Sequence, residues 1–152
     1  MNFGIALHGG AGTILKKEMT LEKEKEYLLG LETALNRGKK ILLNGGSAIE
    51  AVTETVVELE NNSLFNAGKG SVFNHLGQHE MDASIMNGKD LNAGAVCCVE
   101  QFKNPIILAK LVMEKSEHVM LTGNGAMEFG EKMNCEKVEE SYFFDQLRYD
   151  QW

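Results

Sequence analysis

The chain has 152 residues, which is enough for one domain with a hydrophobic core. Its hydrophobic content of 43% and charged content of 24% are ordinary for a globular protein. The formal net charge of −7 argues against nucleic acid or an anionic membrane as partner, because both need a basic face. We also expect no membrane span, because no apolar run approaches the roughly 20 residues that a span needs.

The start of the sequence and its cysteines favour a reducing compartment. The opening MNFGIALHGG lacks a charged region and a small-residue cleavage site, so it does not resemble a secretory signal. Cys97, Cys98 and Cys135 are odd in number, and the first two are adjacent. We therefore expect a cytoplasmic protein, and we interpret the cysteines as small buried hydrophobic residues.

The first predicted element is a buried strand over Phe3 to Leu7, followed by the glycine-rich segment His8-Gly9-Gly10-Ala11-Gly12. Glycines permit positive φ angles and allow successive N–H groups to point into a concavity. Two interpretations stay open at this point. The segment is either an anion-accepting loop beside a reaction centre or a tight connection to the next helix.

Two amphipathic helices follow. Thr20 is a plausible N-cap, and leucines then recur at helical spacing as far as Leu42. Gly45-Gly46 ends this helix, and Ser47-Ala48-Ile49-Glu50 is a capping box that opens a second helix reaching Leu59. We expect the two helices to form one layer that covers a sheet built by the later strands.

The segment from residue 59 to 99 combines a loop with three strand-like runs. The loop Asn66-Ala67-Gly68-Lys69-Gly70 precedes the runs 71–73, 81–86 and 93–99, which together predict a meander. Asn87-Gly88 is a strong hairpin signal between the last two runs. Asn66 is the main candidate site residue, because asparagine offers both donors and an acceptor and tolerates a loop apex.

The remaining residues predict helices and one more strand. Asn104-Pro105 is typical of an N-cap followed by the first helical residue, and a helix is expected to continue to Lys115. A strand is predicted over 118–122, a turn at Gly123-Asn124-Gly125 and a helix over 126–133. The aromatic tail, 142–152, is expected to be helical.

Three familiar chemistries do not fit. Gly68-Lys69-Gly70-Ser71 lacks the spacing of a phosphate-binding loop. His75 and His79 flank a turn glycine and not a helical HExxH pattern, so a zinc site is disfavoured. Asp82 alternates with apolar neighbours in a strand, which favours a structural carboxylate over a general base.

Four separated segments resemble the N-terminal part of the isoaspartyl peptidase/L-asparaginase family, the plant-type asparaginases. They are HGGAG at residue 8, LFNAGKGSVFN at 64, EMDASIMNGKDLNAGAV at 80 and NPIILAKLVMEKS at 104. The resemblance runs from about residue 3 to about residue 129. It implies an N-terminal-nucleophile hydrolase with an α+β, four-layer α/β/β/α sandwich, in which residues 1–152 form the α subunit of a single domain.

The resemblance also implies a mechanism. A threonine at the head of a β subunit, released when the precursor cuts itself at a Gly-Thr bond, would attack asparagine or a β-aspartyl dipeptide and release aspartate. The only Gly-Thr here is Gly12-Thr13, which belongs to the glycine-rich loop, so the nucleophile is expected outside this chain. Asn66 would assist it, and His8, Gly9, Gly10 and Gly12 would shape the far wall. An (αβ)₂ heterotetramer acting on a small molecule, without an organic cofactor, is expected.

A structural Na⁺ ion is also implied by the resemblance. Hard cations prefer oxygen ligands, and an irregular loop can turn main-chain carbonyls inward. The position-by-position match assigns the ligands to main-chain carbonyls of the loop after the second helix: Leu59, Glu60, Asn62, Phe65, Ala67 and Lys69. The ion is expected to hold Asn66 in place.

Other functions remain open from the sequence. A glycosylasparaginase-like amidohydrolase shares the superfamily, although HGGAG fits the isoaspartyl peptidases better. A non-enzymatic module could use the glycine-rich loops to bind an anion or nucleotide, and a purely structural subunit is a third alternative.

Overall fold

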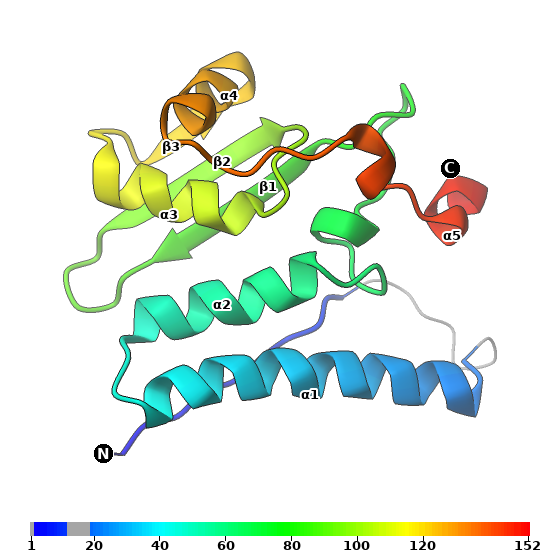
Figure 1. Ribbon diagram of the computed structural model, residues 1–152, viewed down its shortest axis with the longest axis horizontal. Coiled ribbons are helices and arrows are strands. Elements are labelled where there is room, and N and C mark those ends of the chain that lie inside the picture. The colour runs from blue at the N-terminus through cyan, green and yellow to red at the C-terminus, as the bar shows by residue number, and fades with distance from the viewer. Residues whose placement is uncertain (1, 12–18) are drawn as a thin grey trace.

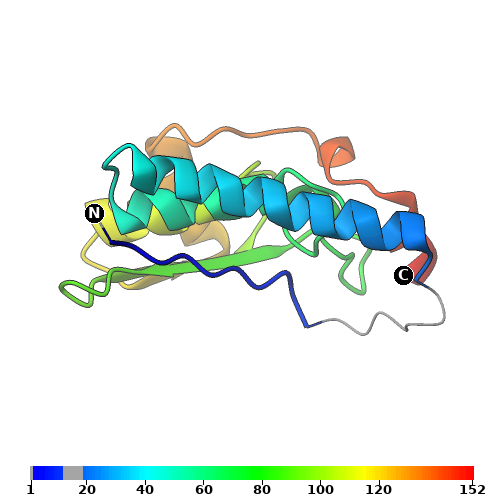
Figure 2. The ribbon, with the colours of Figure 1, turned by 90° about the horizontal axis from the view of Figure 1, so that it is seen from below.

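The computed structural model describes residues 2–11 and 19–152. Three helices, α1 (Leu21–Leu43), α2 (Ala48–Glu60) and α3 (Pro105–Lys115), lie side by side, with α3 over a small sheet (Figures 1 and 2). The sheet contains β1 (Met81–Met86), β2 (Ala93–Val99) and β3 (Met120–Thr122) in that order. The helix α4 (Gly123–Lys132), the 3-10 turns η2 (Gly68–Gly70) and η3 (Glu140–Tyr142), and α5 (Gln146–Gln151) complete the described elements.

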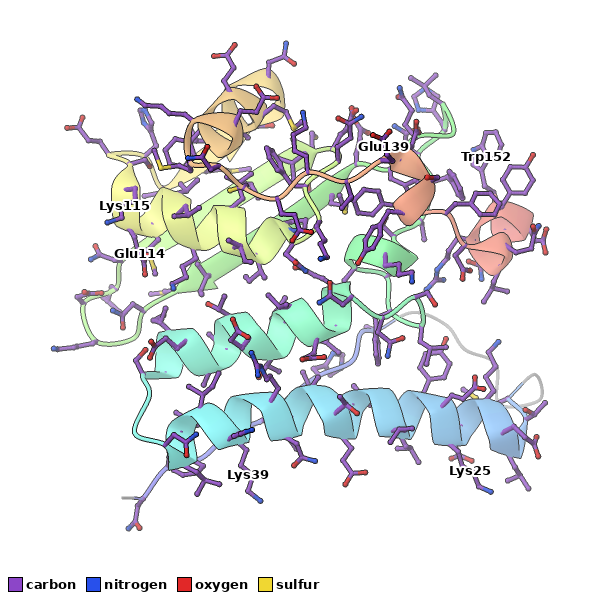
Figure 3. All side chains as sticks on the ribbon, viewed as in Figure 1. Lys25, Lys39, Glu114, Lys115, Glu139 and Trp152 are labelled. Atoms are coloured by element: carbon purple, nitrogen blue, oxygen red, sulfur yellow. The ribbon has the colours of Figure 1, made fainter. Side chains whose placement is uncertain are left out.

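The helix starts follow the predicted capping chemistry. The Thr20 side chain accepts a hydrogen bond from the Lys23 N–H at the start of α1. Ser47 and Glu50 form both halves of the capping box at the start of α2. The outer face of α1 carries charged side chains such as Lys25 and Lys39, which point away from the rest of the molecule in Figure 3. These local signals are therefore confirmed.

The predicted hairpin is also confirmed. β1 and β2 pair antiparallel, with Ser84 opposite Ala95 and Met86 opposite Ala93. β3 then pairs parallel with β2, and α3 makes the crossover that a parallel pair requires. Of the strand predicted over 118–122, only Met120–Thr122, which is β3, forms a strand.

Two predicted strands are wrong. Residues 3–7 run along α1 without a strand partner among the described residues, and Ile5 lies against Gly38 of α1. Residues 71–73 are not a strand either, because the Ser71 N–H closes the η2 turn onto the Gly68 carbonyl. An extended run becomes a strand only when a neighbour offers a hydrogen-bond ladder, so the three-run meander is reduced to one hairpin.

The helix layer also differs from the expectation. α3 covers the β1–β2 face, where its buried Leu108, Ala109 and Val112 meet Val96 and Val99 in the main core. α2 reaches only the edge of this core, and α1 packs on α2. The predicted turn over 123–125 is the first turn of α4. The structure thus confirms a mixed α/β arrangement, while the four-layer sandwich stays a prediction.

No helix within residues 2–11 and 19–152 has the length and apolar character needed to cross a bilayer.

A second, smaller apolar cluster supports the loop after α2. Ala34, Leu59 and Phe65 are buried together, with Leu7 and Leu31 packed against them. Through this cluster the N-terminal segment, α1 and the loop are held in contact.

Candidate active site

A cavity of about 640 Å³ lies where the N-terminal segment, α1, the loop after α2 and α5 meet. Its described lining includes His8, Gly9, Gly10 and Asn66, four of the residues singled out from the sequence. Gly12 lies outside the described residues. The structure therefore brings together two segments more than 50 residues apart in sequence, although it does not assign them a role.

Asn66 is exposed at the cavity wall and its side chain is anchored on one side only. Its Oδ1 accepts a hydrogen bond from the Val72 N–H at 3.0 Å, which ties the amide to the chain leaving the loop. Within the described residues its Nδ2 has no hydrogen-bond partner. An amide held at its oxygen in this way presents its N–H₂ group as a donor.

The N-terminal segment His8-Gly9-Gly10, which lines the same cavity as Asn66, takes its shape from its glycines. The Gly10 N–H donates to His8 Nδ1 at 3.2 Å, so a neutral His8 ring carries its proton on Nε2. Gly10 has a φ of 111°, a conformation that favours glycine. A Cβ on Gly9 would lie 2.7 Å from Leu31 Cδ2, so glycine also permits the close approach to α1.

The loop after α2 turns main-chain oxygens toward two glycines. A Cβ built on Gly68 would collide with the Glu60 carbonyl oxygen, and one on Gly70 with the oxygens of Ser63 and Phe65. Gly68 has a φ of 51° as well. The carbonyls of Glu60 and Phe65 both belong to the predicted sodium ligand set. They border the space, called the cradle below, that a side chain at Gly68 or Gly70 would fill. Ser63 was not in that set.

Of the other predicted ligands, Leu59 and Ala67 line the cavity as well. The main-chain oxygens of Leu59, Asn62 and Ala67 accept loop hydrogen bonds from Asn62, Phe65 and Gly70. A carbonyl has two lone pairs, so these bonds leave a second pair for a cation. The side chain of Lys69 is directed to Tyr142, with Nζ 5.6 Å from the centre of the ring. The group of Lys69 that belongs to the predicted ligand set is its main-chain carbonyl.

Glu60 links this loop to α3. Its side chain is buried and its Oε1 accepts from the Ile106 N–H at 2.9 Å, whereas Oε2 has no partner among the described residues. Burial raises the pKa of the Glu60 carboxyl to about 7. Asn104 occupies the N-cap position of α3, but its side chain makes no cap hydrogen bond. Instead, the Glu60 carboxylate accepts the hydrogen bond from the Ile106 N–H in the first turn of α3.

Arg148 was missed by sequence reasoning. From α5 its Nε donates to the Gly70 carbonyl oxygen at 2.9 Å, and Nη2 lies 3.4 Å from the Leu64 oxygen. Arg148 and Lys23 line the cavity, and its described lining includes no carboxylate. This charge favours an anionic ligand. The only available signal was that Arg148 is the single basic residue among residues 142–152.

The cysteines differ from the expectation, and the two histidines lie in different environments. His79 is buried against Ser71 and Phe73 while His75 is exposed, so the two do not form a ligand pair. Cys98 is exposed and Cys97 and Cys135 are only partly buried, so the interpretation as buried hydrophobic residues is wrong for Cys98. Hydrogen bonding to Asp82, and then to Cys98, raises the pKa of the Cys97 thiol to about 12.

Known proteins show the same sequence pattern. Residues 1–152 match the family described as Asparaginase. Over 147 residues the chain is 50% identical to a Dictyostelium discoideum protein and 46% identical to the isoaspartyl peptidase of Escherichia coli K12. It is 44% identical over 148 residues to the plant-type L-asparaginase of Thermococcus kodakarensis. Each alignment covers 97% of this chain but only 42%, 46% and 46% of the relative. The chain thus spans less than half the length of these relatives.

Proposed function

Because the chain belongs to the Asparaginase family, whose relatives are named as hydrolases, we propose that it forms one part of an amidohydrolase acting on L-asparagine or β-aspartyl dipeptides. The observation that carries the proposal is the meeting of His8-Gly9-Gly10 and Asn66 around one cavity. The lining cations Lys23 and Arg148 suit a substrate that carries carboxylates.

The nucleophile of the proposed reaction lies in the remainder of the protein. A threonine freed at the head of a β subunit would attack the side-chain or isopeptide carbonyl, with its own α-amine as base. An acyl-enzyme forms, ammonia or an amino acid leaves, and water releases aspartate. Donors at the cavity would stabilise the tetrahedral oxyanion, which is usually a large contribution in acyl transfer. Asn66 Nδ2 is the donor that this chain offers.

The assembly proposed is an (αβ)₂ heterotetramer with a four-layer sandwich. The support is the sheet face opposite α3, on which Asp82, Ser84 and Met86 are exposed in the described chain. A second sheet packed there would complete the sandwich.

A structural Na⁺ ion is proposed for the loop after α2. The carbonyls of Glu60 and Phe65 already face the cradle beside Gly68 and Gly70, and those of Leu59, Asn62, Ala67 and Lys69 complete the proposed ligand set. The ion would supply charge that fixes the loop, and hence the Asn66 amide beside the reacting groups.

The test uses the full-length protein and two matched substitutions. Asn66→Ala should lower turnover of β-aspartyl-leucine and asparagine on the order of 10²-fold per processed molecule, as loss of one oxyanion donor does. Asn36→Ala, at an exposed position of α1, should leave turnover unchanged. Terminal sequencing of any smaller product should give threonine. Equal turnover in the two variants, or no hydrolysis with anion binding alone, would refute the proposal.

A further inference from the structure

We propose that Asn87 is a site of spontaneous chemical modification, at which the side-chain amide is lost and an isoaspartyl linkage to Gly88 forms. An asparagine followed by glycine favours this reaction, because glycine has no side chain to hinder ring closure. The chain contains three such pairs: Asn44-Gly45, Asn87-Gly88 and Asn124-Gly125. The structure distinguishes among them.

The reaction joins a backbone nitrogen to the preceding side chain. The Gly88 nitrogen gives up its proton to hydroxide and attacks Asn87 Cγ. The Cγ–Nδ2 bond breaks, and the leaving nitrogen departs as ammonia. Water then opens the cyclic succinimide at either carbonyl. Opening at the main-chain carbonyl leaves the chain connected through Cβ and Cγ, which is the isoaspartyl form, and opening at Cγ gives aspartate. Only water is consumed, and the proposed amidohydrolase activity is not involved.

Gly88 has the free N–H that this attack requires. Gly88 is exposed, and within the described residues its nitrogen makes no hydrogen bond. The Gly45 N–H, by contrast, donates to the Leu42 carbonyl oxygen at 3.1 Å where α1 ends. That hydrogen bond must open before Gly45 can attack, so Asn44 is protected although it is exposed.

Asn124 is also exposed, but it lies in the first turn of α4. A helix holds ψ at about −42°. Ring closure requires the next nitrogen to swing toward the side-chain carbon, so Asn124 must leave the helical conformation first. Asn87 directly follows β1 and precedes a turn, and no helix restrains it.

The Asn87 side chain is already folded over the peptide that follows it. Its Oδ1 accepts a hydrogen bond from the Lys89 N–H at 3.1 Å. Because this bond spans the Gly88 residue, it keeps the amide carbon beside the Gly88 nitrogen, and it draws electron density away from that carbon. A Cβ built on Gly88 has nothing within 4 Å, so there is room for the ring to close.

The turn stays accessible in the proposed four-layer assembly. It lies beyond the last ladder pair, Met86 with Ala93, at the end of the sheet (Figure 1). It also bends toward the helices, since Asn87 lines a cavity of about 690 Å³ together with Ser47 beside α2 and Lys110 of α3. The second sheet is proposed for the opposite face, so its packing does not cover the turn.

The test follows the three pairs in the full-length protein, aged in mildly alkaline buffer below its melting temperature. Peptide mapping with electron-transfer fragmentation distinguishes asparagine, aspartate and isoaspartate at each position. We expect Asn87 to lose its amide, mainly to isoaspartate, on the order of tenfold or more faster than Asn44 and Asn124, which need local opening. Gly88→Ala should slow the loss at Asn87 on the order of tenfold or more, because the added methyl group hinders attack.

Gly125→Ala is the matched control. It also has nothing within 4 Å of the added carbon, and it should leave the rate at Asn87 unchanged. In denaturant the three pairs should react at similar rates, which separates the effect of the structure from that of the local sequence. Equal rates in the folded protein, or faster loss at Asn44 or Asn124, would overturn the proposal. An Asn87 rate that Gly88→Ala leaves unchanged would do the same.

Discussion

Arg148 Nε donates a hydrogen bond to the main-chain oxygen of Gly70 at 2.9 Å, joining residues 78 positions apart. The same guanidinium approaches the Leu64 oxygen at 3.4 Å, so α5 contacts the loop on both sides of Asn66. A planar guanidinium can serve two acceptors at once, whereas an ammonium is a point charge. The aromatic tail thereby positions the loop that carries the candidate catalytic amide.

Replacing Arg148 should therefore affect both stability and catalysis. Arg148→Gln is expected to lower the free energy of unfolding by about 1.5–3 kcal/mol, the range for a hydrogen bond to a charged group. Turnover should fall because Arg148 positions the loop, and KM should rise because the same guanidinium lines the cavity that we propose to bind carboxylates. Arg148→Lys should restore only part of this loss. Denaturant unfolding and steady-state kinetics on the full-length protein measure both effects.

Arg37→Gln is the control for loss of a positive charge. Arg37 pairs with Glu54 on the surface, where the two side chains are 48% and 35% exposed. Such pairs contribute less than about 1 kcal/mol. If Arg37→Gln and Arg148→Gln had equal effects, the positioning role of Arg148 would be wrong.

Gly70 should tolerate no side chain. An added Cβ would collide with the main-chain oxygens of Ser63 and Phe65, and backbone cannot move as a flexible side chain does. Gly70→Ala is expected to destabilise the protein by roughly 2 kcal/mol or more and to reduce turnover. Gly88→Ala, which has nothing within 4 Å of the added carbon, should change stability by no more than about 0.5 kcal/mol. Thermal unfolding of the two variants makes the comparison.

Because His79 is buried, we expect the protein to lose stability at acid pH. Burial lowers the pKa of its imidazole, with the Ser71 hydrogen bond and the Glu140 charge opposing that effect. The folded state therefore takes up a proton less readily than the unfolded chain. The contribution of neutral His79 to the free energy of unfolding is complete above about pH 6.5, the pKa of histidine in the unfolded chain. It is lost as the pH falls toward the lower pKa of His79 in the folded state.

His79→Gln should remove this part of the pH dependence, measured as the free energy of unfolding between pH 8 and 5. Glu60 also titrates in this interval, so the quantity to compare is the difference between variant and unsubstituted protein at each pH. His75→Gln, at an exposed position, should retain the acid-side loss. A His79→Gln curve parallel to that of the unsubstituted protein would contradict the assignment.

Local chemistry explains what could be predicted from sequence. The caps at Thr20 and Ser47 and the Asn87-Gly88 hairpin depend on residues close together in the chain, and all three form where expected. The strands predicted over 3–7 and 71–73 depended on partners elsewhere, and a propensity pattern does not show whether a partner exists. For the same reason Glu60, 46 residues from Ile106, replaces the expected Asn104 cap.

The candidate site was partly predictable. Asn66 and His8 were found because short motifs carry them, and the structure places both at one cavity. Arg148 was missed because its contacts cross most of the chain.

Sodium should stabilise the full-length protein if the carbonyl loop binds it. A ligand that binds only the folded state adds about 1.4 kcal/mol for each tenfold excess over its Kd, so the melting temperature should rise with NaCl concentration. Choline chloride at equal ionic strength is the control for screening. Gly70→Ala, which displaces the oxygens of Ser63 and Phe65, should lose the sodium-specific rise, and Gly88→Ala should keep it. Equal melting temperatures in NaCl and choline chloride would show that these carbonyls face one another without holding an ion.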